Sequence, residues 1–334
     1  MADVAALAGV ALGTVSNTLN NPDKVSEATR RRVLAAISEL GFVRNDAARS
    51  LAAGTSTAIG LVLADLSNSF FVDIARGVEQ VARRNGMDVL IANTDVDPDR
   101  EVRNLQLFER ARTAGIIFAP LDTALAKGTR LPARKTPTVL VNFASPTLAY
   151  AGVTVDERHG GALAVEHLVA LGRRRLLFVG GPKFLSAVAD RYEGARSAAS
   201  ATGVELDDLD TRGLNIAHGR HAAQEIFARG AGRYDGIVAA SDLLAIGIIQ
   251  SLSDRPGFAV PGDMAVTGYD NNHFASESSI PVTTVAQPGE EMGRIAADLL
   301  LEQIAHHEAS KRTVVVEPHL IPRRSSLGDL WRRA

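Results

Sequence analysis

The sequence contains no cysteine, so disulfide bonds and thiolate metal sites are excluded. This absence fits a reducing compartment, and we expect the protein to be cytoplasmic. No apolar run approaches the roughly 18 residues that a membrane span needs, so we expect no membrane partner. The first ten residues carry Asp3 but neither Lys nor Arg, which argues against a secretory signal.

A net positive charge is also missing, because 36 Lys and Arg residues face 38 Asp and Glu residues, for a net charge of −2. No basic field spans the whole chain, and any contact with DNA must come from a local surface. At 334 residues the chain is too long for one compact core, so we expect two or three domains.

Signatures of catalysis and of bound metal are lacking as well. No nucleophile elbow is present, and the Gly-Gly-Pro run at residues 180–182 lacks the rest of a phosphate-binding motif, so we interpret it as a turn. The pairs His218-x-x-His221 and His306-His307 have no carboxylate pattern beside them, and we interpret them as surface histidines. We therefore expect no enzyme activity, no cofactor and no metal site.

The first forty residues have the spacing of three short helices. Residues 3–8 and 12–19 each place apolar side chains on one face, and Gly9 between them suits the positive φ of a tight turn. Ser26 is a natural N-cap for a third helix, which Gly41 ends. The buried stripe of this helix is predicted to be Val33, Ala36, Ile37 and Leu40. This order predicts an all-α helix-turn-helix headpiece, and a generic three-helix bundle is the alternative.

The second of these helices carries small polar side chains. They are Thr14, Ser16, Asn17 and Thr18. Side chains of this size can meet phosphates and base edges without filling a DNA groove. The helix is therefore a candidate DNA-reading element.

From about residue 58 the pattern changes to short apolar strands that alternate with amphipathic helices. Two-sided apolar runs are typical of parallel sheets covered on both faces, and two consecutive sets predict two doubly wound α/β lobes. The predicted strands are residues 59–64, 87–92, 115–118, 138–141, 175–180, 236–239 and 264–268. The predicted helices are residues 70–85, 99–113 and 161–171.

Polar and aromatic side chains end or follow several of these elements. Ligands of open α/β sheets bind beyond the carboxyl ends of the strands. Phe can stack on a sugar or base, while Asp, Asn, Arg and Gln make directed hydrogen bonds. The candidates are Asn68, Phe70, Phe71, Asp156, Arg191, Ser241, Asp270 and Gln287. The two phenylalanines also suit simple packing at a helix start.

The headpiece motifs resemble those of the lactose/galactose repressor family. The shared pattern comprises Asp3-Val4-Ala5, Ala8-Gly9-Val10, Thr14-Val15-Ser16, Leu19-Asn20, Val25-Ser26, Thr29-Arg30, Val33, Gly41-Phe42, Asn45, Ala48-Arg49-Ser50-Leu51 and Gly60. The resemblance extends to about Ser326. Members of the family usually have a few more residues before Asp3, so we expect a truncated or misassigned start.

The resemblance implies a set of DNA contacts. Base reading is implied for Leu12, Gly13 and Asn17, and phosphate contact for Thr14, Ser16, Asn20 and Ser26. Many members have an Arg where Asn17 stands. The pattern continues through Asn45 into a helix-prone hinge at residues 47–53, which is implied to fold on DNA and to insert Leu51 into the minor groove.

The resemblance also implies a two-lobed sensor like the type I periplasmic binding proteins, in which a helix at residues 290–306 returns to the first lobe. The positions implied to line its effector cleft are Asn68, Phe70, Phe71, Asp156, Arg191, Asp270 and Gln287. Leu214 belongs to the same site, at a position where many relatives have an aromatic side chain that closes the stack. The expected effector is a sugar, a sugar phosphate or a nucleoside.

We therefore expect a headpiece at residues 1–43, a hinge and linker at 44–57 and an effector-binding and dimerisation domain at 58–334. The lobes of this domain are expected at about 58–156 with 288–315 and at about 157–287 with 316–326. The predicted function is a homodimeric, ligand-controlled transcription factor, most often a repressor, on a near-palindromic double-stranded DNA operator. A sugar-binding protein without a DNA role and an enzyme on an α/β scaffold are the alternatives. Whether the effector releases or promotes DNA binding stays open.

Overall fold

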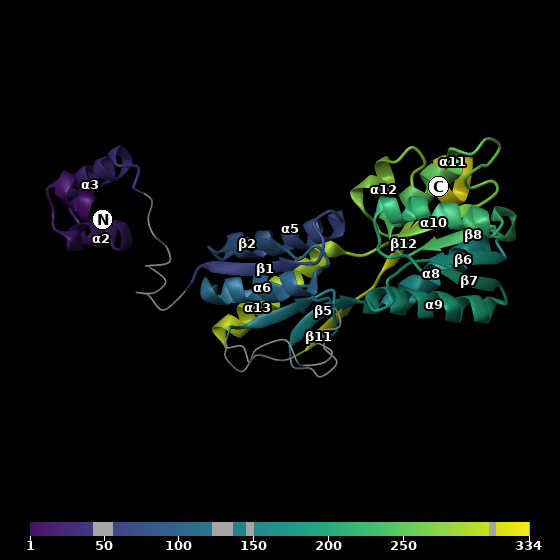
Figure 1. Cartoon of the computed structure of the whole chain (residues 1–334). Helices are drawn as coiled ribbons and strands as arrows, with labels where there is room; N and C mark the ends of the chain where they lie inside the picture. Colours follow the sequence, from purple (N-terminus) through teal and green to yellow (C-terminus); the bar gives the residue numbers. More distant parts are fainter. Residues whose placement is uncertain (43–55, 122–135, 145–149, 307–311, 334) are drawn as a thin grey trace. The chain divides into compact units, whose positions relative to one another are not determined.

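The computed structural model describes residues 1–42, 56–121, 136–144, 150–306 and 312–333. The chain divides into two compact units, Met1–Ser56 and Thr57–Ala334 (Figure 1). The predicted hinge helix, with Asn45 and Leu51, lies outside the described residues.

In the described part of the first unit, residues 1–42, three helices surround a small apolar core. Val4, Val15 and Val33, one from each helix, are fully buried, and Gly9 takes a φ of 62° in the first turn. The elements are α1 (Ala2–Ala8), α2 (Leu12–Asn20), the 3-10 turn η1 (Pro22–Lys24) and α3 (Glu27–Glu39). The predicted helix-turn-helix arrangement is confirmed.

The third helix has the predicted ends. Ser26 Oγ accepts a hydrogen bond from the backbone N–H of Thr29 at 3.4 Å, and Gly41 takes a φ of 54° just beyond the last turn. The predicted burial of Leu40 is wrong, because Leu40 is the C-cap residue and its side chain is exposed. The apolar stripe therefore ends one turn earlier than the spacing indicated.

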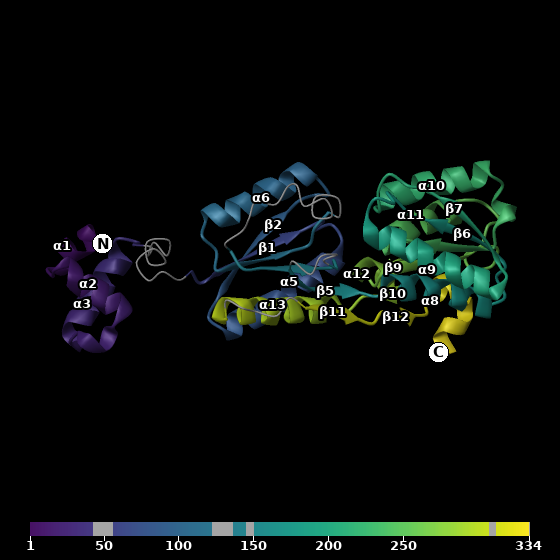
Figure 2. The same cartoon turned by 90° about the horizontal axis from the view of Figure 1, so that it is seen from below.

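The second unit has two lobes, and the first is built on a parallel sheet of order β11-β5-β4-β3-β1-β2. Its strands are β1 (Ala58–Leu63), β2 (Asp88–Asn93), β3 (Gly115–Phe118), β4 (Thr138–Val141), β5 (Ala151–Val155) and β11 (Thr313–Val316). One face is covered by α5 (Ser69–Arg84) and α13 (Gly289–Ala305), and the other by α6 (Pro98–Arg110) (Figure 2). Neighbouring β1 residues alternate between them, since Leu61 belongs to the α5 side and Val62 to the α6 side.

Two glycines let α5 and α13 pack against each other closely. A Cβ atom on Gly77 would lie 2.1 Å from the carbonyl oxygen of Glu290, and one on Gly293 would lie 2.1 Å from that of Ile74. Any larger residue would push the two helices apart. The middle of α5 is thereby fixed to the helix that returns from the second lobe.

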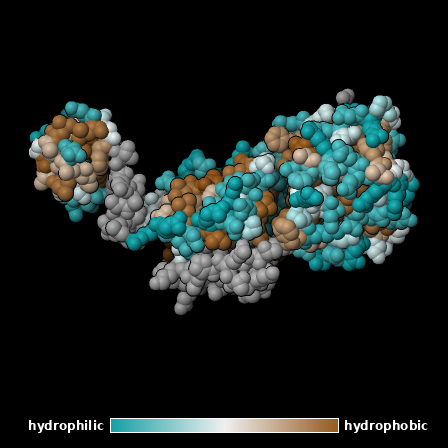
Figure 3. Space-filling view, in the orientation of Figure 1, coloured by the Kyte–Doolittle hydropathy of each residue, from teal (hydrophilic) through white to brown (hydrophobic). Residues whose placement is uncertain are grey.

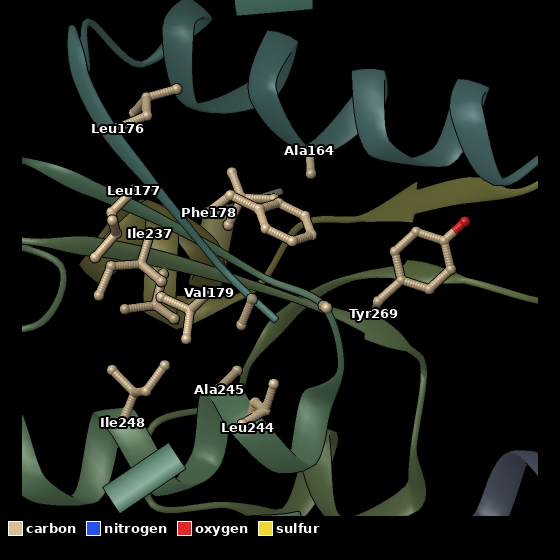
Figure 4. Close-up of a cluster of buried hydrophobic side chains, with 14 of the residues drawn as sticks. Ala164, Leu176, Leu177, Phe178, Val179, Ile237, Leu244, Ala245, Ile248 and Tyr269 are labelled. Atoms are coloured by element: carbon tan, nitrogen blue, oxygen red, sulfur yellow. The ribbon is translucent and has the colours of Figure 1, made fainter. Parts of the chain in front are cut away.

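The second lobe has a sheet of order β12-β10-β9-β8-β6-β7, parallel except for the edge strand β12, which runs antiparallel to β10. Its strands are β6 (Arg175–Val179), β7 (Glu205–Leu209), β8 (Gly236–Ala239), β9 (Ala265–Asp270), β10 (Thr283–Ala286) and β12 (His319–Ile321). Its helices are α8 (Glu157–Ala170), α9 (Ser186–Thr202), α10 (Ile216–Ala228), α11 (Asp242–Ser253), α12 (His273–Glu277) and α14 (Arg324–Leu327), with 3-10 turns η2 (Ala231–Arg233) and η3 (Gly328–Arg333). Figure 4 shows Phe178 on the α8 side of this sheet and Leu244 and Ile248 of α11 on the other.

The sequence patterns did not predict β5, β7, β10, β11 and β12. The edge strand β7 reads Glu-Leu-Asp-Asp-Leu and is only partly buried, so it lacks an apolar run. In β10 the buried residues include Thr283 and Thr284, and the Thr283 hydroxyl donates to the Arg323 carbonyl oxygen at 2.9 Å. Threonine is a good strand former, but a search for runs of apolar residues does not count it.

The chain crosses between the lobes three times, from β5 to α8, from β10 to α13 and from β11 to β12. The two doubly wound lobes predicted from the sequence are confirmed. Within the described residues no single helix is long and apolar enough to cross a membrane; only α1 and α2 taken together, with a bend of 99° between them, have that length and composition.

Candidate DNA-reading helix and ligand cavity

The α2 helix presents a polar surface next to an exposed apolar residue. Leu12, Gly13, Asn17 and Asn20 are exposed, and Leu12 has 55% of its surface accessible. Thr18 instead is buried and donates to the Thr14 carbonyl oxygen at 2.8 Å, so the idea that it faces a groove is wrong. The helix thus has one face free for DNA and one face in the core.

The residues predicted to contact phosphate lie at this surface with their side chains locally ordered. Thr14 and Ser16 are half-buried, and Asn20 donates to the Ser16 hydroxyl at 3.2 Å. Ser26 is exposed, and its hydroxyl lies 3.0 Å from that of Thr29. The hydrogen bonds between these side chains fix their positions, and the side chains are small enough for a DNA backbone to approach them.

A cavity of about 690 Å³ lies within the second unit and is lined from both lobes. The volume falls in the range of small-molecule sites. The predicted residues that line it are Asn68, Phe70, Phe71, Arg191, Leu214, Asp270 and Gln287. They come from the start of α5, from α9, from the end of β9, and from the loops that follow β7 and β10. Residues distant in the sequence therefore meet in one place, at the carboxyl ends of parallel strands.

Asp270 is the centre of the polar part of this cavity. It is 5% exposed; its Oδ2 accepts from Asn68 Nδ2 at 2.7 Å, and its Oδ1 accepts from Gln287 Nε2 at 2.7 Å. Burial raises the pKa of its carboxyl above the ordinary value, and the guanidinium of Arg191, 3.5 Å away, opposes the shift. Asp270 also takes a φ of 100°, a strained conformation that is concentrated at functional sites.

Arg191 is held almost completely out of solvent. Its Nε and Nη2 donate to the two carboxylate oxygens of Glu157 at 2.8 and 3.0 Å, and its Nη1 donates to the Ala240 carbonyl oxygen at 2.7 Å. The guanidinium lies 3.8 Å from the ring centroid of Tyr269. Burial lowers the pKa of Arg191, but the carboxylates of Glu157 and Asp270 outweigh it and raise the pKa above its ordinary value. The guanidinium is charged and fixed in direction.

Two predicted residues do not line the cavity. Asp156 caps α8 and accepts from the His159 backbone N–H at 2.9 Å, while the next residue, Glu157, turns inward to Arg191. Ser241 caps α11 and donates to the Leu214 carbonyl oxygen at 2.7 Å. Both serve helix starts, because an N-cap side chain folds back on its own helix.

Other lining residues were missed by the sequence reasoning. His218 lines the cavity, and its Nδ1 is buried without a hydrogen-bond partner, so the interpretation of this residue as a surface histidine is wrong. Phe184, with 53% of its surface accessible, and Arg212 also line it. All three follow strands β6 or β7, and the missed strand β7 explains why Arg212 and His218 were overlooked.

The aromatic and apolar residues that line the cavity differ in how far they are buried. Phe70 is 2% exposed and belongs to the first-lobe core, whereas Phe71 is half-buried, with the two ring centroids 5.2 Å apart. Leu214 packs against the core of the second lobe. Phe71 therefore has the more accessible ring of the pair.

Comparisons with known proteins agree with both units. Residues 1–45 match the family described as bacterial regulatory proteins, lacI family, and residues 165–326 match the periplasmic binding protein-like domain. The chain is 32% identical to the HTH-type transcriptional regulator RegA of Clostridium saccharobutylicum, over 97% of this chain and 98% of that protein. It is also 32% identical to the ribose operon repressor of Bacillus subtilis, over 97% of each.

Solved structures give the same picture. The lac repressor dimer bound to operator and the anti-inducer ONPF has a TM-score of 0.82 at 25% identity, over 97% of this chain and 98% of that one. The transcriptional regulator CelR–cellobiose complex has a TM-score of 0.71 at 30% identity, with the same coverage. A helix-turn-helix headpiece followed by a two-lobed sensor with a polar cavity defines a ligand-responsive DNA-binding regulator.

The chain belongs to the lacI family of bacterial regulatory proteins. It is a transcriptional regulator and not an enzyme, and a solute-binding protein without a DNA role does not account for the headpiece.

Proposed function

We propose that this regulator is a repressor that binds a near-palindromic operator as a homodimer, with its affinity set by a small effector in the cavity. In this proposal residues 1–43 read DNA, residues 44–57 are the hinge and linker, and residues 58–334 bind the effector and dimerise. Two copies double the length of DNA read by a single short helix. Because operator binding requires access to the chromosome, we propose that the protein acts in the cytoplasm.

The proposed base-reading surface is Leu12, Gly13 and Asn17. Asn suits a bidentate contact with adenine, and an exposed Leu side chain suits contact with a thymine methyl group. Phosphate contacts are proposed for Thr14, Ser16, Asn20 and Ser26. Asn45 and Leu51 are proposed for the hinge contact, with Leu51 as a minor-groove wedge.

The observation that carries the effector proposal is the hydrogen-bonded set around Asp270. The Asp270 carboxylate meets Asn68 of the first lobe and Gln287, and the Gln287 Oε1 atom is buried without a partner. An unmet buried acceptor has a free-energy cost, which a ligand N–H or O–H can remove. We therefore propose a ligand with several hydroxyl groups, a sugar or a sugar derivative, with a nucleoside as the alternative.

The same residues supply a route from the cavity to the lobe orientation. Besides Asn68–Asp270, three contacts join α5 or its start to the α12 region. Asn272 Nδ2 donates to Asn68 Oδ1 at 3.0 Å, the His273 N–H donates to Ser69 Oγ at 2.9 Å, and His273 Nε2 lies 3.2 Å from Asp73 Oδ1. A ligand that competes for Asn68 or Asp270 changes the balance of these contacts, which is the differential interaction that coupling between two sites needs.

The proposed dimer surface includes the edge strand β2. Its side chains Leu90 and Ile91 are exposed, as are the nearby Leu66 and Val96. Figure 3 shows apolar surface over the part of the first lobe that Figure 1 labels β1, β2 and α5. An open apolar sheet edge needs a cover, and a second copy of the chain supplies one.

The experiment is a gel-shift titration of the full chain on the DNA upstream of its own gene. Sedimentation of the same sample gives the oligomeric state. The proposal expects a dimer that retards one or more fragments containing an inverted repeat. A monomer in solution, or no retardation of any upstream fragment, would contradict it.

A further inference from the structure

We infer that the effector carries an anionic group, a phosphate or a carboxylate, which Arg212 and His218 bind in the same cavity as the Asp270 set. The inference rests on the proposed function, since it concerns the ligand of the same cavity. It narrows the choice among sugars, sugar derivatives and nucleosides.

The pairing of the charged side chains that line the cavity is the first argument. Asp65 accepts from Ser67 N and Oγ at 2.8 Å each, and Asp95 lies 3.0 Å from Arg100. Asp270 and Arg191 have the partners already described. Among the described charged and histidine side chains that line the cavity, only Arg212 and the imidazole of His218 have no side-chain partner.

Their position is the second argument. Arg212 lies in the loop after β7, and His218 lies in the first turn of α10. The loop between them lies beside the end of β8, because Ser241 Oγ donates to the Leu214 carbonyl oxygen at 2.7 Å, and β8 is the direct neighbour of β9, the strand that carries Asp270. Both groups line the same cavity as the Asp270 set, so one ligand can meet a basic group and the Asp270 set together.

The fixed position of the His218 ring is the third argument. A Cβ atom on Gly213 would lie 2.7 Å from His218 Cε1 and 2.9 Å from Nδ1, so a side chain there would displace the ring. The His218 backbone N–H donates to the Asn215 side chain at 3.0 Å, which fixes the first turn of the helix. The imidazole is thereby held beside the cavity with its Nδ1 unsatisfied.

The chemistry that fits such a place is an oxyanion. A guanidinium binds phosphate or carboxylate through two parallel N–H groups, and an imidazole N–H adds a third donor. His218 lies in the first turn of α10, so the positive end of this helix dipole also favours an anion there. In the same cavity, Gln287 Oε1 and the Asp270 carboxylate accept from hydroxyl groups. The ligand class is thus a hydroxylated compound with one anionic end.

Matched pairs of probes test this inference on the full-length protein by isothermal titration calorimetry. The pairs are ribose with ribose 5-phosphate, glucose with glucose 6-phosphate, and glucose with gluconate. We expect the anionic member of at least one pair to bind tenfold or more tightly than its neutral partner. The phosphate and carboxylate arms distinguish the two sources of the anion.

Three variants show whether the preference comes from the proposed residues. Arg212→Ala and Gly213→Ala should each remove most of the tenfold preference for the anionic probe. Gly213→Ala acts by displacing the His218 ring. Arg220→Ala is the matched control, because Arg220 lies on α10 like His218 but bonds to Gln250 outside the cavity. This control should keep the preference.

Neutral sugars that bind as tightly as their anionic partners would overturn the inference and leave the proposed function intact. An anionic preference that survives in Arg212→Ala would overturn the residue assignment. Failure of every probe to bind would also contradict the inference. The gel-shift experiment tests the proposed function independently of that result.

Discussion

Asn68 Nδ2 lies 2.7 Å from Asp270 Oδ2, and this hydrogen bond joins the two lobes of the sensor at the wall of its cavity. Asn68 caps α5, whose Gly77 packs on the returning helix α13, and Asp270 ends β9 in the other lobe. A ligand at Asp270 thus touches a contact that connects rigid elements of both lobes.

Glu157→Gln should destabilise the second unit. The change leaves the buried Arg191 guanidinium without its bidentate carboxylate partner, and breaking a buried pair in this way costs about 3 kcal/mol. Urea denaturation followed by circular dichroism measures the free energy of unfolding. Glu166→Gln, an exposed position on the same helix, is the control and should change it by less than about 0.5 kcal/mol. Equal stability of the two variants would contradict the role of Glu157.

Asp242 should make the stability pH-dependent. Burial, followed by the charge of Asp270, holds the pKa of the Asp242 carboxyl well above 3.8. The folded state therefore binds this proton more tightly, and the stability it contributes is lost as pH rises from 3.8 through the raised pKa. Asp242→Asn stays neutral and should gain stability relative to the wild type over that window.

Urea denaturation of both proteins between about pH 4 and pH 8 measures this difference. Some pH dependence should remain in the variant, because the pKa of Asp270 is also raised. Identical pH profiles for the two proteins would mean that Asp242 titrates in the same way in the folded and unfolded chains.

Gly77→Ala should weaken the packing of α5 on α13. The added methyl carbon would lie 2.1 Å from the Glu290 carbonyl oxygen, so the helices must separate, at a cost of about 1–3 kcal/mol. Gly232→Ala, where no atom lies within 4 Å of the added carbon, is the control. Thermal unfolding compares the two, and an unchanged melting temperature for Gly77→Ala would show that the helices yield without cost.

Asn17→Arg should change which bases are read in each half-site. Asn17 is exposed on α2; Asn prefers adenine, whereas Arg prefers guanine, with about 1–3 kcal/mol of discrimination for a good bidentate contact. Selection from a randomised operator library compares the preferred sequences of wild type and variant. The same preferred sequence for both would remove Asn17 from the base-reading set.

Much of the fold was predictable because its signals are local. Gly9 and Gly41 mark helix ends through their positive φ, Ser26 marks a helix start, and the buried parallel strands read as apolar runs. The strands that were missed are those whose environment is set by distant parts of the chain. The edge strand β7 is polar because one side meets solvent, and Thr283 is buried because Arg323 and Ser326 meet its hydroxyl.

The site was predictable in part for the same reason. Asn68, Arg191, Asp270 and Gln287 lie at strand or helix ends, and the resemblance to a known family indicated them. Asp156 was chosen instead of Glu157, because the sequence does not reveal which of two adjacent acids caps the helix and which turns inward. The place of His218 depends on the path of the chain after β7, and that strand was not predicted.

The central claim is that a small molecule at Asp270 controls operator affinity, and one measurement tests it most directly. Operator dissociation constants are measured for wild type and Asp270→Asn, with and without each member of a panel of sugars and sugar phosphates. Asp254→Asn, an exposed position, serves as the control.

We predict that at least one compound changes the wild-type and Asp254→Asn constants fivefold or more, about the lower end of allosteric coupling. The same compound should change the Asp270→Asn constant less than twofold relative to that variant's own ligand-free constant. An Asp270→Asn protein that responds as the wild type does would contradict the account.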